Sequence, residues 1–406
     1  MAKHASGAAV AAALASLILG GCSNGTPTAR TAAAAVAVLA PPALASDDGG
    51  TTVYVRRDLV SDGCLSAEHT DPNLVNAWGI AATATSFWWV SDNGTGLSTL
   101  YDGDGNAQAL VVNVTGTGSP PAPAAPTGVV ANGGTAFVVS SGGASGPARF
   151  LFASEDGTIS GWNPGVPPGP STSTQTIVEV DKGANAVYKG LALASTAAGD
   201  RLYATNFRAG TVEVYDGTFQ PVGGSGAFVD PRIPAGYAPF GIRVIGELVY
   251  VTYAKQDDAK QDDAKHDDVA GKHHGFLDAY TVDGTLARRV ASGGKLDSPW
   301  GLALAPSDFG SASDQLLVGN FGDGHLIAYD VTPGHGRLED REGNQRSGTY
   351  LEDLNGPIVI DGLWGLGFGN GGKAGPPSTL FFAAGPDHEN HGLFGRLDVP
   401  PAASMP

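Results

Sequence analysis

The sequence predicts an all-β fold, a six-bladed β-propeller with four-stranded blades whose ring is closed by an N-terminal strand. A glycine followed by aliphatic residues recurs six times, at intervals of 49 to 64 residues. Each copy is followed by alternating, β-rich runs that end in turn residues, and no long helical periodicity lies between the copies. Units of four strands repeated in this way are typical of propeller blades. The six copies are Trp78-Gly79-Ile80-Ala81, Thr127-Gly128-Val129-Val130, Lys189-Gly190-Leu191-Ala192, Phe240-Gly241-Ile242-Arg243, Trp300-Gly301-Leu302-Ala303 and Trp364-Gly365-Leu366-Gly367.

The repeated glycine belongs to the innermost strand of each blade. Innermost strands crowd around a narrow axis, and a residue without a Cβ lets neighbouring backbones approach. We expect the aliphatic residues after the glycine to pack between blades. Second strands follow as "FWWVSDN", "RLYATNF" or "QLLVGNF", third strands as "TVEVYDG" or "LIAYDVT", and outer strands as "ALVVNV" or "TIVEV".

The sixth unit ends at "LFGRLDV" and lacks an outer strand, whereas Val53 to Val60, "VYVRRDLV", has no blade of its own. We therefore expect this N-terminal segment to complete the sixth blade. Two stacked β-sandwiches are the alternative fold, but sandwiches do not require six regularly spaced glycine motifs.

The N-terminus is typical of an exported chain. Residues 1–21 read as a signal peptide that ends in "LILGGC", a pattern like the lipobox of bacterial lipoproteins, so Cys22 is the predicted lipidation site. Residues 22–52 form a predicted flexible tether, residues 53–399 the propeller and residues 400–406 a C-terminal tail. Cleavage before Ser46, after Ala43-Leu44-Ala45, is the alternative and would give a secreted protein. With Cys22 lipidated or removed, Cys64 has no partner, and no disulfide is expected.

The composition excludes some partners. The net charge is −17, and only 16% of the residues are charged. Nucleic acid is not expected as a partner, because phosphate binding requires basic patches. Apart from the signal segment, no stretch is apolar enough to span a bilayer, so a membrane contact would run through the lipid anchor only.

Residues Ala254 to Gly275 contain three copies of a five-residue unit, AKQDD, AKQDD and AKHDD. The stretch lies between the second and third strands of the fourth unit, so we expect an insertion on the propeller rim. The Asp pairs recur every five residues, without the spacing of a calcium-binding hand. A solvated loop is the expected role, and a weak cation site or a partner contact are the alternatives.

Two groups of residues are candidates for a functional site. The residues before the motif glycines should surround the axis, where aromatic rings could stack on a ligand or instead fill the core between blades. In "GPDHENHGLFG" a loop offers three donors for a divalent cation, although the HExxH pattern of zinc proteases is absent. The candidate ligand-binding face is Trp78, Lys189, Phe240, Trp300 and Trp364, and the candidate metal ligands are Asp387, His388 and His391.

Several stretches resemble an uncharacterised family of exported bacterial six-bladed β-propellers, related in pattern to NHL-repeat propellers. The matching stretches include "HTDPNLVNAWGIA", "FLFASEDGTISGWNPG", "SPWGLALAP" and "IVIDGLWGLGFGN", and together they cover essentially the whole propeller. The resemblance implies the fold and export but supplies no catalytic residue.

We therefore expect an exported, lipid-anchored scaffold of the bacterial cell envelope that binds a small ligand or an envelope protein. The alternative is a propeller enzyme of the lactonase or quinoprotein-dehydrogenase kind, which uses a metal or cofactor on the axis. The sequence does not identify a cofactor, and a divalent cation is the one that its acidic residues would suit. No G-x-S-x-G elbow, P-loop or C-x-x-C motif is present.

Overall fold

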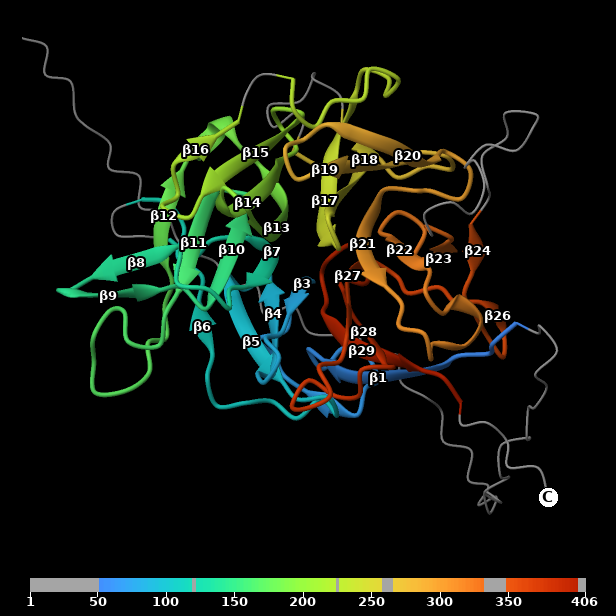
Figure 1. Cartoon of the computed structure of the whole chain (residues 1–406). Helices are drawn as coiled ribbons and strands as arrows, with labels where there is room; N and C mark the ends of the chain where they lie inside the picture. The colour runs from blue at the N-terminus through green and yellow to red at the C-terminus, as the bar shows by residue number, and fades with distance from the viewer. Residues whose placement is uncertain (1–50, 119–121, 224–225, 258–265, 332–347, 401–406) are drawn as a thin grey trace, which may run out of the picture. The chain divides into compact units, whose positions relative to one another are not determined.

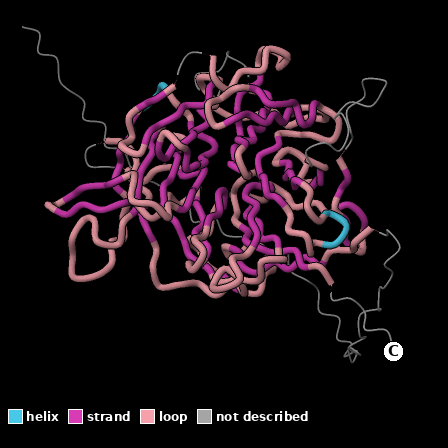
Figure 2. Tube along the Cα trace, viewed as in Figure 1, coloured by secondary structure: helices cyan, strands magenta, loops and turns pink. Residues whose placement is uncertain are grey.

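A computed structural model describes residues 51–118, 122–223, 226–257, 266–331 and 348–400. The described chain is almost entirely strand and turn, with only two short 3-10 helices, η1 (Gly183–Asn185) and η2 (Gly310–Ala312). Strands and loops make up nearly all of the trace in Figure 2. Within these ranges no helix is long and apolar enough to cross a membrane.

Six sheets form the blades, as predicted (Figure 1). Five of them have four strands and run outward from an inner strand that carries the glycine motif. In chain order they are β3 (Ala77–Ala81), β4 (Trp88–Asp92), β5 (Leu97–Tyr101) and β6 (Val112–Asn113); β7 (Pro126–Ala131), β10 (Phe150–Ser154), β11 (Thr158–Trp162) and β12 (Ile177–Asp181); β13 (Tyr188–Thr196), β14 (Gly199–Asn206), β15 (Thr211–Asp216) and β16 (Pro221–Val222); β17 (Tyr237–Ile245), β18 (Leu248–Lys255), β19 (Phe276–Thr281) and β20 (Leu286–Ser292); and β21 (Pro299–Leu304), β22 (Leu316–Asn320), β23 (Leu326–Tyr329) and β24 (Thr349–Tyr350).

The sixth sheet closes the ring. It consists of β27 (Leu363–Phe368), β28 (Leu380–Ala384), β29 (Leu393–Asp398) and the N-terminal strand β1 (Val55–Ser61). Strands β1 and β29 pair antiparallel, from Val55 opposite Asp398 to Ser61 opposite Leu393. The predicted closure is confirmed, with one addition: the short strand β2 (His69–Thr70) pairs parallel to β1 and makes this a five-stranded sheet.

Two hairpins lie outside the blades: β8 (Val138–Ser141) with β9 (Ala144–Pro147), and β25 (Glu352–Asp353) with β26 (Gly356–Pro357). The first hairpin lies in the chain between the inner strand β7 and the second strand β10 of the second blade.

The inner strands contact one another in the order β3, β7, β13, β17, β21 and β27, and β27 returns to β3. The motif glycines explain how close these contacts are. A Cβ built on Gly241 would lie less than 3.0 Å from the carbonyl oxygen of Trp300 in the next blade, and one on Gly301 would meet the carbonyl of Trp364 in the same way. All six motif glycines have such a backbone neighbour, so none has room for a side chain.

The aliphatic residue after each glycine packs between blades, as expected. Leu191 joins the apolar cluster between the second and third blades, Leu302 joins the cluster between the fourth and fifth, and Leu366 joins the one between the fifth and sixth. The core is therefore a set of wedges between neighbouring sheets, arranged around the axis. Burial of these apolar surfaces is the main stabilising contribution, at roughly 25 cal/mol per Å².

Candidate functional site

The residues before the motif glycines meet at the axis and form an aromatic plug, which we define as Trp78, Phe240, Trp300 and Trp364 with their neighbours Phe207 and Phe321. The rings of Trp78 and Trp364 stack with centroids 3.4 Å apart, and Trp300 meets Trp364 edge-on at 5.7 Å. Trp300 is the most exposed of the four, at only 9%. The predicted ligand-binding face is thus brought together, but its rings pack against one another and form an apolar cluster.

Lys189 occupies the same position in the third blade and carries charge into this apolar surrounding. Its side chain is 1% exposed, and its Nζ forms ion pairs with Glu155 and, at 3.0 Å, with Oδ1 of Asp267. Nζ also lies 5.1 Å from the centroid of the Trp78 ring. Burial opposes the charged form of Lys189, but the charges of Glu155 and Asp267 outweigh it and raise the pKa of Lys189 above its ordinary value. Lys189 is therefore a fixed ammonium and not a nucleophile.

Asp267 belongs to the third copy of the repeated unit, which corrects the expectation of a purely solvated insertion. The insertion does join β18 and β19, as predicted, and residues 258–265 of it lie outside the described residues. The described part of the insertion after residue 265 runs antiparallel to the chain that leaves β18, and Gln256 and Asp268 form an isolated β-bridge. His266 lies 3.1 Å from Asp267, and its hydrogen bond, together with the charge of Lys189, lowers the pKa of Asp267.

Asp268 is the most perturbed carboxyl of this segment. Burial raises its pKa to about 7. Its Oδ2 atom is enclosed and has no hydrogen-bond partner within the described ranges. At neutral pH this carboxyl is therefore partly protonated, in contrast to its neighbour Asp267.

A hydrogen-bonded chain continues from Lys189 around the mouth of the ring. Glu155 accepts a hydrogen bond from Asn93 Nδ2 at 3.0 Å, and the Nδ2 group of Asn76 donates to Asn93 Oδ1 at 3.2 Å and to Glu389 Oε1 at 3.0 Å. The indole of Trp78 donates to Asn76 Oδ1 at 3.0 Å. Burial raises the pKa of Glu389. These side chains come from the loops between second and third strands and from the segments that enter the inner strands.

The candidate metal ligands Asp387, His388 and His391 are not held as one cluster. His391 Nδ1 lies 2.7 Å from Asp62 Oδ2, and its Nε2 lies 3.7 Å from Asp387 Oδ2. His388 is exposed and belongs to neither group of metal donors found in the described chain.

Asp62, Cys64 and His391 do form such a group. However, Cys64 is not a free thiol but is disulfide-bonded, which corrects the expectation that it has no partner. Its sulfur is not a thiolate ligand for a metal. Cys22, the predicted lipidation site, lies outside the described residues.

The second donor group is Glu155, His266 and Asp267, whose ligand atoms all lie within 4.8 Å of one another. Both of its carboxylates already pair with the Lys189 ammonium. A divalent cation at this place would have to compete with that ammonium.

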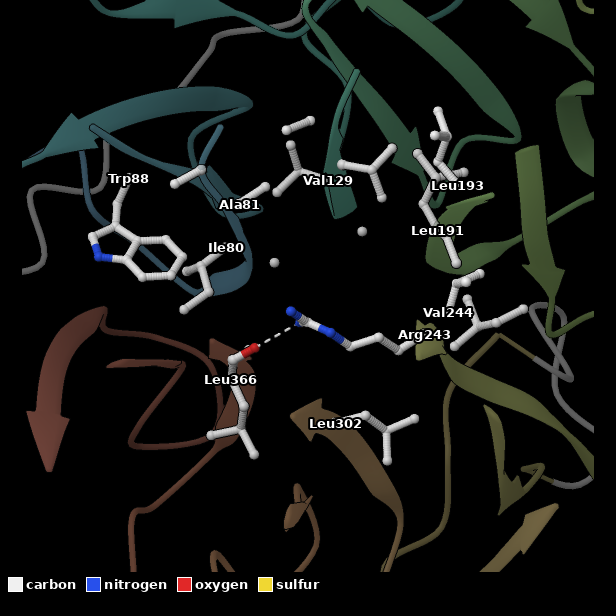
Figure 3. Close-up of a pocket in the computed structure, with 18 of the residues that line it drawn as sticks. Ile80, Ala81, Trp88, Val129, Leu191, Leu193, Arg243, Val244, Leu302 and Leu366 are labelled. Carbon is white, nitrogen blue, oxygen red and sulfur yellow. Dashed lines mark hydrogen bonds between the residues drawn. The ribbon is translucent and has the colours of Figure 1, made fainter. Parts of the chain in front are cut away.

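The inner strands also line a partly open cavity of about 300 Å³ (Figure 3). All six inner strands contribute to it, and Trp300 of the plug lines it. Its walls are mainly aliphatic, and Arg243 is the one charged side chain among the lining residues. They are Gly79, Ile80, Ala81, Ala82, Trp88, Gly128, Val129, Val130, Ala131, Leu191, Ala192, Leu193, Ile242, Arg243, Val244, Trp300, Leu302, Gly365, Leu366, Phe368 and Asn370.

Sequence reasoning did not select Arg243, although the repeat contained the signal. Two residues after the motif glycine, the other five copies carry Ala81, Val130, Ala192, Ala303 and Gly367. Arg243 is an exception to this pattern, because the other copies have small or aliphatic residues at this position. In the structure its side chain lines the cavity.

Comparison with solved structures finds propellers of low sequence identity. A streptogramin B lyase shares 9% identity and a TM-score of 0.46, covering 87% of this chain and all of that one. A protein of unknown function from Bacteroides thetaiotaomicron shares 11% identity and a TM-score of 0.46, covering 87% of this chain and 74% of that one. At these values the likeness says nothing about activity.

Relatives found by sequence share a higher identity with this chain than these solved structures do. One uncharacterised protein of Acanthamoeba polyphaga mimivirus is 33% identical over 347 residues, which is 84% of this chain and 78% of that protein. A second one from the same virus is 32% identical over 347 residues, covering 84% of each. These relatives are viral, so they do not support the expected bacterial origin. No protein-family model matches the chain. The chain therefore belongs to the same protein family as these two mimivirus proteins.

Proposed function

We propose that this propeller is an exported binding protein that holds a small ligand in its axial cavity. The observation that carries the proposal is the cavity itself, which measures about 300 Å³ and is lined by all six inner strands and by Trp300 of the aromatic plug. Cavities of this kind, apolar with a small number of polar groups, are the usual form of small-molecule sites. Because the walls belong to the rigid inner strands, the site is formed before a ligand arrives.

The lining chemistry favours binding over catalysis. Among the described lining residues, the only group that ionises is Arg243, and a guanidinium does not deprotonate to serve as a general base. The lining also offers no hydroxyl or thiol nucleophile within the described ranges.

A cavity-filling variant tests the proposal. Ala81 lines the cavity in Figure 3, so Ala81→Phe should occupy the space without adding charge. A panel of small organic compounds is screened by calorimetry, first against the wild type and then against this variant. Binding to the wild type that Ala81→Phe abolishes, with the circular dichroism spectrum unchanged, supports the proposal. Absence of any binding to the wild type, or binding that the variant leaves intact, contradicts it.

The second candidate is a metal-dependent propeller enzyme. The observation in its favour is the group of Glu155, His266 and Asp267 beside Asp268, whose pKa of about 7 would suit an acid or base. Elemental analysis of the purified protein, before and after dialysis against a chelator, separates the two functions. One stoichiometric metal ion that the chelator removes would favour the enzyme.

Export, with lipid anchoring at Cys22, forms part of the proposal. The chain has only two cysteines, so lipidation of Cys22 and an intramolecular disulfide of Cys64 are mutually exclusive states. Export and anchoring are supported by the signal-like residues 1–21 and the lipobox pattern that ends at Cys22. Expression with a labelled fatty acid should label the wild type and not Cys22→Ser, and the variant should move to the soluble fraction. A mature N-terminus at Ser46, found by mass spectrometry, would show secretion without an anchor.

A further inference from the structure

Arg243 is placed in the axial cavity, and the described residues supply it with no acidic partner. It follows Ile242 on β17, and its side chain extends into the cavity toward β27 (Figure 3). Its Nη1 donates to the carbonyl oxygen of Leu366 at 2.9 Å. This is the hydrogen bond that the described residues supply to it, although a guanidinium carries five N–H donors.

The other polar side chains that line the cavity are already committed elsewhere. The indole of Trp88 donates to Ala374 O at 2.8 Å, and the indole of Trp300 donates to Lys189 O at 3.0 Å. The Nδ2 group of Asn370 donates to two backbone carbonyls, and its Oδ1 accepts from two backbone N–H groups. The remaining donors that face the cavity are those of Arg243.

The charge of Arg243 has no counter-charge in the described chain. The side chain is half-buried among the apolar cavity walls, which lowers the pKa of Arg243, and no neighbouring carboxylate in the described ranges offsets this. A single hydrogen bond to Leu366 O does not require a guanidinium, since a neutral amide could donate the same bond with a smaller loss of hydration free energy. The arrangement is therefore suited to an anion that completes the site.

We propose that Arg243 binds the carboxylate of a small organic acid whose apolar body packs against the aliphatic cavity walls. A guanidinium matches a carboxylate through two parallel hydrogen bonds. One cation balances one negative charge, whereas a phosphate dianion would need further donors that this lining does not offer. A volume of about 300 Å³ lies at the lower end of the usual range for ligand pockets, so the acid should be small. This inference rests on the proposed function, because it names the class of ligand that the same cavity holds.

Matched pairs of acids and alcohols test the charge requirement. Butyrate, hexanoate, octanoate and benzoate are titrated into the full-length protein by calorimetry, each beside its neutral alcohol, with inorganic phosphate as a further probe. At least one carboxylate should bind at least tenfold more tightly than its alcohol. Arg243→Met should lose that tenfold preference while its affinity for the alcohol stays within about threefold. Arg243→Lys should retain part of the preference, because it keeps the charge but loses the paired hydrogen bonds.

The outcomes separate this inference from the proposed function. If acids and alcohols bind equally and Ala81→Phe abolishes both, the cavity binds ligands but the carboxylate assignment is wrong. If carboxylates bind and neither Arg243 variant changes their affinity, the assignment is also wrong. Phosphate binding in preference to every carboxylate overturns the assignment in favour of an inorganic anion. If none of the probes binds the wild type, the carboxylate inference fails, whereas the proposed function is judged by the broader compound screen.

Discussion

At the scale of single residues, the glycine of the repeated motif is the position that tolerates least change. Gly241 faces the backbone carbonyl of Trp300, and the corresponding glycines of the other blades face the next inner strand in the same way. The sequence predicted both the residue and its reason, because crowding at a narrow axis follows from the repeat alone.

Gly241→Ala should therefore destabilise the protein by about 2 kcal/mol or more, within the range expected for overpacking in a rigid core. Chemical denaturation measures the difference. Gly133 is the matched control, because a Cβ there would meet nothing within 4 Å and its φ is not positive. Gly133→Ala should stay within about 0.5 kcal/mol of the wild type. Equal effects of the two variants would contradict the close approach at the axis.

Asp268 gives the stability a pH dependence. Its folded pKa of about 7 lies above the ordinary value of 3.8, so the native state binds more protons than the unfolded state between these values. The stability contributed by this group is therefore present at low pH and is lost as the pH rises through 7. Asp268→Asn should raise the melting temperature more at pH 8 than at pH 5. A gain that is the same at both pH values would show that Asp268 titrates normally.

The axial residues show where sequence reasoning stops. The place of Lys189 before a motif glycine predicted an axial position, and the structure places its Nζ 5.1 Å from the centroid of the Trp78 ring in the aromatic plug. Its partners Glu155 and Asp267 come from loops of the second and fourth blades, which are far apart in the sequence. Only the packing of these three consecutive blades around the axis brings them together, so the repeat pattern could not reveal the ion pairs.

At the scale of elements, long strands were predictable and short ones were not. The motif strands and their second and third neighbours alternate clearly over four or more residues. Two-residue strands such as β2, β25 and β26 carry no such periodicity, because they pair only where a neighbouring edge is already in place.

The insertion between β18 and β19 should tolerate shortening. Deleting Ala259 to Asp263 removes one repeated unit and leaves Gln256, Asp267 and Asp268, which make the described contacts. Loop-closure entropy changes slowly with length, so the melting temperature should shift by no more than about 2 °C. Calorimetry with and without a chelator checks this. A clear drop, with a chelator effect on the intact chain only, would indicate a metal site in the insertion.

At the scale of the whole molecule, the ring is held together by the pairing of β1 with β29. The segment before β1 also touches the β25–β26 hairpin, where Tyr54 N donates to Glu352 O at 2.8 Å, and the fifth blade, where Tyr54 Oη donates to Phe309 O at 2.9 Å. One short N-terminal segment therefore joins two blades. The sequence predicted this closure, because the N-terminal strand had no blade of its own and the sixth blade lacked an outer strand.

Deleting Thr52 to Ser61 should destabilise all six blades together. The loss opens the ring between β29 and the rest of the chain, and each blade depends on its neighbours for its core. Denaturant unfolding followed by tryptophan fluorescence and by circular dichroism should show one coincident transition at much lower denaturant than the wild type. An unchanged main transition, with only a small early one, would mean that β1 is a local edge.

The same closure sets the order of events during biosynthesis. Roughly 330 residues separate β1 from its partner β29, and chains are made at roughly 5–20 residues per second. About 20 to 60 s therefore pass between the synthesis of β1 and that of its partner strand β29. During that time an unpaired strand edge is open to pairing with other chains. Strand β1 is the first of the described strands to be synthesised, but it can pair with β29 only at the end. The ring is therefore completed only after nearly the whole chain has been synthesised.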